Sequence, residues 1–263
     1  MPIAGKRSLK DEAICLNRRD FSESSLVLVL LCRNTGKVSL LAKGARRPTA
    51  AKASLAVDLL DIGRVGFIMN PDGLGLLQEF AGLTGFGSIR RDLDKWNACL
   101  YLAELANLAA KDFAPAAELF DLLKHALDAI ASAPAREDIA TLLVDAARAI
   151  LAWSGFEPQL RQCVFCTRTL KPTDELFFSP SQGGLICRDC EPTTTDKLRL
   201  EHRTWYYLLG KVKDPISAGK AFELLDRMTY EHLGRSCRML RHCNDLFRRS
   251  EHRKGYKNVN QDR

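Results

Sequence analysis

Two CxxC pairs lie in the second half of the chain and constrain its fold more than any other feature. They place Cys163 with Cys166 and Cys187 with Cys190, and twenty residues separate the pairs. This spacing is typical of a site in which two short turns bring four thiolates to one Zn²⁺ ion. Because all four ligands are sulfur, no coordination position stays open for a water molecule. The pattern therefore predicts one structural zinc ion and not a catalytic one.

Two disulfide bonds are the alternative for the same cysteines, and the choice depends on the redox compartment. The stretch MPIAGKRSLKDEAI has no apolar core like that of a secretory signal, and the longest apolar run, 26–32, is too short to span a bilayer. We therefore expect a cytoplasmic protein, in which thiols stay reduced. The other five cysteines lack CxxC spacing, and we expect them to be small buried hydrophobic residues: Cys15, Cys32, Cys99, Cys237 and Cys243.

The first 80 residues have the pattern of β-strands. Five apolar stretches are separated by turn residues, and they lie at 12–19, 25–32, 37–44, 55–70 and 74–81. The sequence Arg33-Asn34-Thr35-Gly36 predicts a hairpin turn between the second stretch and the third. Five short strands in about 80 residues favour a small barrel over a sandwich of seven or more strands. Gly63 and Gly66 fit the bend that a small barrel needs.

From Asp92 the apolar period changes from two to 3.6, which predicts helices. Three such stretches precede the cysteines, and the helical period returns after Pro192. The zinc knuckle, at about 160–192, is therefore inserted between helices. We expect an α+β multidomain protein, with a five-stranded barrel at 1–80 and a mostly α-helical domain at 81–263.

The positive charge is concentrated near the beginning of the chain. The net charge is +7, and the first 52 residues hold 11 basic against 4 acidic side chains. Such a concentration is typical of proteins that bind polyanions, although a generic basic surface is the alternative. The candidate DNA contacts are Arg18, Arg19, Lys37, Lys43, Arg46, Arg47 and Lys52. Because Phe21 is the only aromatic residue among the first 66, we expect phosphate contacts to dominate and binding to depend steeply on salt.

Motifs of the common enzyme classes are missing from the sequence. It contains no GxxxxGK[ST] phosphate loop, no GxSxG, no HExxH, and no HxE upstream of the cysteines. The five histidines lie in predicted helices or in the C-terminal tail, and none accompanies a nucleophile. We therefore expect a protein that is not an enzyme.

Three stretches of the chain together resemble the bacterial RecO recombination mediators. The first is EAICLNRRDFSESSLVLVLLCRNTGKVSLLAKGARR at 12–47, the second is GFEPQLRQCVFC with GGLICRDC, and the third, weaker one is HLGRSCRML. The matching residues of the first stretch are Arg18, Arg19, Phe21, Glu23, Ser24, Gly36, Lys37, Ala42, Lys43, Gly44, Ala45, Arg46 and Arg47. The three stretches follow one another in the order that the family shows.

The resemblance implies an N-terminal OB-fold and a helical domain that carries the zinc knuckle. It also implies a function: to bind single- and double-stranded DNA, to anneal complementary strands and to help load RecA onto DNA coated by single-stranded-DNA-binding protein. The implied partners are RecR and the acidic, hydrophobic tail of single-stranded-DNA-binding protein, with RecA involved indirectly. The implied location is the cytoplasm, at the nucleoid.

Three other functions fit parts of the same sequence. A zinc-ribbon transcription factor would read base edges through an exposed helix. An interaction scaffold would use the acidic middle of the chain to dock a partner. A metal-dependent nuclease would need an acidic cluster, and Asp58 and Asp61 are the nearest approach to one.

Overall fold

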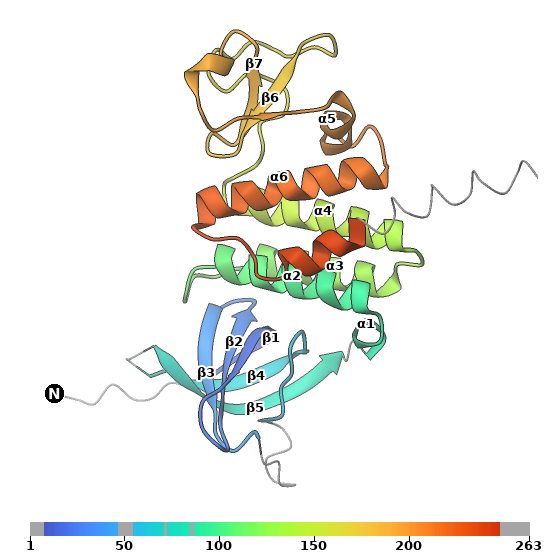
Figure 1. Cartoon of the computed structure of the whole chain (residues 1–263). Helices are drawn as coiled ribbons and strands as arrows, with labels where there is room; N and C mark the ends of the chain where they lie inside the picture. Colours follow the sequence, from blue (N-terminus) through green and yellow to red (C-terminus); the bar gives the residue numbers. More distant parts are fainter. Residues whose placement is uncertain (1–7, 47–54, 71–72, 85–86, 248–263) are drawn as a thin grey trace, which may run out of the picture. The chain divides into compact units, whose positions relative to one another are not determined.

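The chain forms two compact units, Met1–Ala131 and Ser132–Arg263. The computed structural model describes residues 8–46, 55–70, 73–84 and 87–247 (Figure 1). Strands β1–β5 belong to the first unit together with helices α1–α3, and α4–α6 belong to the second together with a small sheet, β6–β8. Helices α2, α3 and α4 precede the cysteines, as the sequence predicts. The domain boundary at residue 80 stays a prediction.

The first unit is built on a closed five-stranded barrel, which confirms the predicted OB-like architecture. Its strand order is β1-β2-β3-β5-β4, and all neighbours are antiparallel except the parallel pair of β3 and β5. The strands are β1 (Ser8–Asp20), β2 (Leu26–Cys32), β3 (Gly36–Ala42), β4 (Ile62–Ile68) and β5 (Leu74–Thr84).

Alternation of side chains fills the barrel. Leu28 and Leu30 of β2 and Leu40 of β3 point inward and are fully buried. Val27 and Leu31 of β2 are buried as well and Val29 is half-buried, since Leu31 pairs with Ile14 of β1 and helix α2 packs against β1. A second layer thus covers the outer face at this point, which explains why 26–32 is apolar throughout.

Helices follow the barrel within the first unit. Asp92 caps α2 (Leu93–Ala109), because its side chain accepts hydrogen bonds from the backbone N–H groups of Asp94 and Lys95. The short α1 (Gly87–Arg90) precedes α2, and α3 (Ala117–Ser132) follows it.

The turn between β2 and β3 is the most constrained point of the first unit. The buried carboxylate of Asp11 accepts hydrogen bonds from the backbone N–H groups of Asn34 and Thr35 and from both of their side chains, at 2.8–3.3 Å. Gly36 follows with φ +82°, and a Cβ atom there would lie 1.9 Å from the carbonyl oxygen of Ala114. Only glycine fits, because both the backbone conformation and the contact exclude a side chain.

Replacing Gly36 by Ala should destabilise the first unit by roughly 3 kcal/mol or more. The added methyl group would either force the turn away from Ala114 or leave the backbone strained. The measurement is the midpoint of urea unfolding. Gly73→Ala is the matched control, since Gly73 has φ +84° but a Cβ atom added to it would have nothing within 4 Å. The control should lose only about 1–2 kcal/mol, the cost of the left-handed conformation. Equal losses in both variants would show that the contact with Ala114 does not matter.

Helices α4 (Arg136–Trp153) and α6 (Pro215–Leu233) pack together in the second unit, and α5 (His202–Leu208) packs on α6. Asp214 caps α6 through the Ser217 N–H, and Gly234 ends it with φ +82°. The small sheet has the order β7-β6-β8, with β6 at Leu176–Ser179, β7 at Gly184–Cys187 and β8 at Leu198–Arg199. No helix in the described ranges is both long and apolar enough to cross a membrane.

Candidate metal centre and nucleic-acid interface

Four cysteines of the second unit converge on one point. Cys163 and Cys166 come from a tight turn in which the Thr167 N–H donates to the Cys163 carbonyl at 2.9 Å. Cys187 ends β7, and the Cys190 N–H donates to the Cys187 carbonyl at 3.1 Å. The four sulfur atoms all lie within 4.8 Å of one another. Two turns therefore deliver two thiols each, as the CxxC spacing predicts.

The arrangement of the sulfur atoms fits a tetrahedral zinc ion. A Zn–S distance of about 2.3 Å requires sulfur atoms roughly 3.8 Å apart, and Cys166 Sγ lies 3.7 Å from Cys187 Sγ. That separation is far longer than the roughly 2.05 Å of a disulfide bond, and none of the nine cysteines forms a disulfide bond. The donor set is thus suited to a closed structural metal site.

The environment of Cys163 favours ionisation of its thiol. Burial disfavours the thiolate of Cys163, but the backbone N–H groups of Cys166, Cys187 and Phe165 outweigh burial and lower its pKa to about 6. The other five cysteines are buried, as expected, and burial raises the pKa of Cys15 and Cys99 to about 12. In the described part of the chain, only the two CxxC pairs bring cysteine sulfur atoms together as one group of possible metal ligands.

Backbone hydrogen bonds connect the metal centre to its surroundings in the second unit. The Val164 N–H donates to the Leu185 carbonyl at 2.9 Å, and the Leu185 N–H donates to the Gln159 carbonyl at 3.0 Å. The Trp205 indole Nε1 of α5 donates to the Leu160 carbonyl at 2.8 Å. A Cβ on Gly184 would lie 2.5 Å from Val164 Cγ1, so the chain segments approach closely at this point. These hydrogen bonds link the cysteine turns to α5.

The last residues of β1 carry two arginines on opposite faces of the barrel wall. Arg18 pairs in register with Leu28, an inward-facing residue, and Arg19 pairs with Val27. Arg19 is exposed, and within the described ranges nothing forms an ion pair or a hydrogen bond with its side chain. Lys43, which follows the last residue of β3, is exposed and equally unpartnered there. Because Ala42 pairs with Leu26, Lys43 lies at the same end of the barrel as Arg19.

Arg46 lies at the same end of the barrel, because it donates hydrogen bonds to the turn between β1 and β2. Its backbone N–H donates to the Ser24 carbonyl at 3.1 Å, and its Nη1 donates to the Ser22 carbonyl at 3.0 Å. The same guanidinium forms an ion pair with Asp20 at 3.3 Å. We call Arg18, Arg19, Lys43 and Arg46 the basic turn cluster. Register and hydrogen bonds place these four predicted residues at the same end of the barrel, with Arg18 on the opposite face of the wall from Arg19.

Lys37 lies apart from the basic turn cluster. Its Nζ donates to the Asn107 carbonyl of α2 at 2.9 Å and lies 3.5 Å from Asp112, and its side chain is only 17% exposed. The geometry gives Lys37 a role in holding the β2–β3 turn against α2 and does not favour a DNA contact. Arg47 and Lys52, the remaining predicted contacts, fall outside the described residues.

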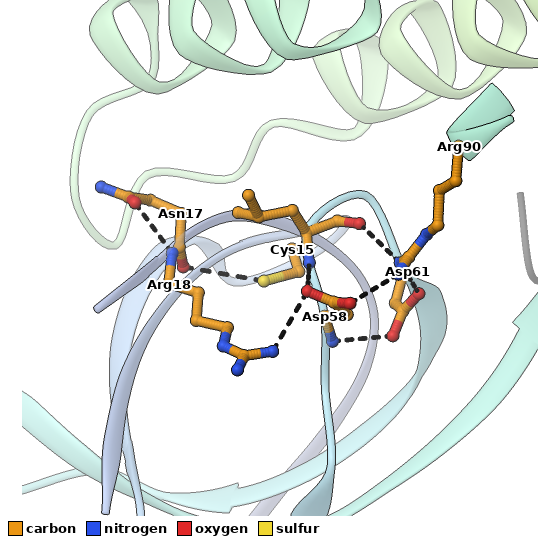
Figure 2. Close-up of polar contacts among 7 residues, drawn as sticks. Cys15, Asn17, Arg18, Asp58, Asp61 and Arg90 are labelled. Atoms are coloured by element: carbon orange, nitrogen blue, oxygen red, sulfur yellow. Dashed lines mark hydrogen bonds and ion pairs between the residues drawn. The ribbon is translucent and has the colours of Figure 1, made fainter. Parts of the chain in front are cut away.

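Figure 2 shows a network around Arg18 that the sequence pattern does not reveal. Arg18 Nη1 donates to Asp58 Oδ1 at 3.1 Å, and Arg90 of α1 donates to the other oxygen of Asp58. Arg90 also donates to Asp61 and to the Leu59 carbonyl, both at 3.0 Å. The network ties the segment before β4 to β1 and α1, and the sequence offered no signal of it because the partners lie far apart along the chain.

The two carboxylates of this network have different acidities. Burial disfavours the charged form of Asp58, but the Leu59 N–H and the Arg90 guanidinium outweigh burial and hold its pKa below the usual range. Burial dominates for Asp61 and raises its pKa. Both side chains are engaged by arginine, so they are poorly suited to hold the metal ion that a nuclease needs.

Comparison with known proteins gives consistent matches over both units. The family models described as Recombination protein O N terminal and C terminal match residues 7–86 and 90–241. A protein from an Anaeromyxobacter species is 34% identical over 70% of this chain and 71% of its own length. One from Rhodopirellula baltica is 33% identical over 69% and 66%, and one from Bacillus pumilus is 27% identical over 86% and 90%. All three relatives are named DNA repair protein RecO.

Proposed function

The chain belongs to the RecO family of DNA repair proteins, and on that premise we propose that it acts as a recombination mediator. In this proposal it binds single- and double-stranded DNA, anneals complementary strands and helps to load RecA onto DNA coated by single-stranded-DNA-binding protein. The observation that carries the proposal is the gathering of four cationic side chains, the basic turn cluster, at one end of a closed barrel.

Neutralisation of phosphates is the physical basis of the proposed annealing. Two strands repel each other through their phosphates, and a cationic surface lowers that barrier while it leaves the bases free to pair. Arg19 and Lys43 are available for phosphates at once. Arg18 and Arg46 must first release Asp58 and Asp20, but exposed ion pairs of this kind contribute only about 0.2–1 kcal/mol. The process makes and breaks no covalent bond, so it requires no catalytic residue.

The remaining parts of the proposal follow from family membership. Arg47 and Lys52 extend the same basic stretch of sequence, and we include them in the interface. One zinc ion held by the four cysteines maintains the second unit and leaves DNA contacts to the barrel. RecR and the tail of single-stranded-DNA-binding protein are the proposed protein partners, RecA takes part indirectly, and the site of action is the nucleoid in the cytoplasm.

The experiment that tests this function is an annealing assay with two complementary, fluorescently labelled strands. We expect the protein to accelerate annealing of bare strands and to continue to do so after the strands are coated with single-stranded-DNA-binding protein. The acceleration should fall steeply as salt rises, because phosphate contacts release counterions.

Competition with unrelated DNA separates this function from its rivals. A mediator should be inhibited equally by related and unrelated competitors, whereas a sequence-specific transcription factor should resist the unrelated one. No binding to single strands at low salt would favour the interaction scaffold and contradict the proposed function.

A further inference from the structure

Phe21 is an exposed aromatic side chain at the beginning of the β1–β2 turn, directly after the end of β1. The described barrel strands and turns contain two other aromatic residues, Phe67 and Phe80, which are 0% and 7% exposed and fill the core, whereas Phe21 is 60% exposed. Exposure of a large apolar ring to water is unfavourable. Packing of the barrel therefore does not account for a phenylalanine at this position.

The turn that carries Phe21 is held in place by several contacts. The N–H groups of Phe21 and Ser22 donate to the Ser25 carbonyl at 3.0 and 3.3 Å, and the Ser25 N–H donates to the Ser22 hydroxyl at 3.2 Å. Arg46 adds its bonds to the Ser22 and Ser24 carbonyls from outside the turn. The ring is thus presented on an ordered support, so little conformational entropy is lost when a ligand binds it.

Cationic side chains surround this support. Arg19 lies two residues before Phe21, Lys43 lies at the same end of the barrel, and Arg46 is bound to the residues on both sides of Phe21. Of the two carboxylates next to Phe21 in the sequence, Asp20 forms an ion pair with Arg46 at 3.3 Å, and Glu23 lies exposed in the turn itself. An exposed aromatic ring within a group of cations matches a chain of phosphates that also offers flat, unpaired bases.

We propose that Phe21 stacks on an unpaired base of single-stranded DNA and gives the basic turn cluster its preference for single strands over duplex. This inference rests on the proposed DNA-binding function. A base in a duplex is stacked on both faces and cannot receive the ring, so the contact exists before annealing and is lost afterwards. The same residue therefore helps to capture a single strand and to release the paired product. Arg46 is a positioning residue for the ring in addition to any phosphate that it binds.

Binding of three fluorescent oligomers of equal length tests the proposal: oligothymidine, an abasic phosphodiester and a duplex. We expect Phe21→Ala to lower the affinity for oligothymidine roughly tenfold, the typical effect of one lost stacking contact. Its affinity for the abasic oligomer and for duplex should stay that of the parent, because no phosphate contact changes. Phe21→Trp should retain the parental affinity, and Phe21→Leu should not.

Tyr230→Ala is the matched control, since Tyr230 is an aromatic residue of similar exposure, 57%, on α6. It should bind all three oligomers like the parent. If Phe21→Ala binds oligothymidine as tightly as the parent, or loses the same factor on the abasic oligomer, the stacking proposal is wrong although DNA binding stands. Failure of the parent itself to bind any of the three would instead overturn the proposed function together with this inference.

Discussion

Replacing Cys166 by Ser should release the metal ion and lower the stability of the second unit by several kcal/mol. Structural zinc binding in small domains is worth about 10–16 kcal/mol, and here the ligands come from two segments twenty residues apart. Without the ion, three thiols and a hydroxyl would face one another, and the two turns would keep only weaker links such as the hydrogen bond from the Val164 N–H to the Leu185 carbonyl. The loss should spread to α5 through the contact between Trp205 and Leu160.

Two measurements on the same preparation check this expectation: zinc content by native mass spectrometry and thermal unfolding. Cys99→Ser is the control, because Cys99 is buried in α2 of the first unit and is not one of the four cysteines of the cluster. The control should keep one zinc ion per chain despite its own packing defect. A metal-free Cys166→Ser protein that melts like the parent would contradict a structural role for the site. Binding of single-stranded DNA at low temperature should change little, since the basic turn cluster belongs to the first unit.

Replacing Arg19 and Lys43 together by Ala should lower the affinity for single-stranded DNA about thirtyfold at low salt. Each is exposed and unpartnered within the described ranges, so each is available to a phosphate, and a charge-assisted contact contributes about 1 kcal/mol at such a site. Arg46 is left unchanged because its removal would also loosen the turn that carries Phe21. The measurement is fluorescence anisotropy with a labelled oligonucleotide.

Arg64→Ala with Lys111→Ala is the matched double control. Both residues are exposed in the first unit, and within the described ranges neither side chain has an ion-pair partner. Arg64 pairs in register with Glu12, seven residues before Arg19 on β1, which is roughly 20 Å along the strand. The two double variants have the same net charge. If they lose affinity equally, overall charge and not the basic turn cluster governs binding.

Much of the barrel could be predicted from the sequence because its strands are short, apolar and separated by turn residues. The register of β4 even departs from regularity next to Gly63 and Gly66, where the sequence indicates a bend. The four-cysteine cluster was predictable for a different reason, since four thiols at fixed spacing leave few other arrangements. Local patterns of this kind need no knowledge of distant contacts.

The contacts of charged residues could not be predicted from such local patterns. Lys37 and Lys43 both lie in a basic stretch, yet one is held against α2 and the other is open to solvent. The difference depends on Asn107 and Asp112, about 70 residues away, which no local pattern reveals. The hydrogen bonds that Arg18 and Arg90 both donate to Asp58 could not be predicted for the same reason. The position of Phe21 in the sequence likewise says nothing of its exposure.

The salt dependence of single-strand binding tests the central claim, that cations at one end of the barrel hold DNA by its phosphates. Each phosphate contact on a single strand contributes about 0.7 to the slope of the logarithm of affinity against the logarithm of salt concentration. The variant that lacks Arg19 and Lys43 should therefore have a slope about 1.4 smaller in magnitude than that of the parent. An unchanged slope in this variant would contradict the claim.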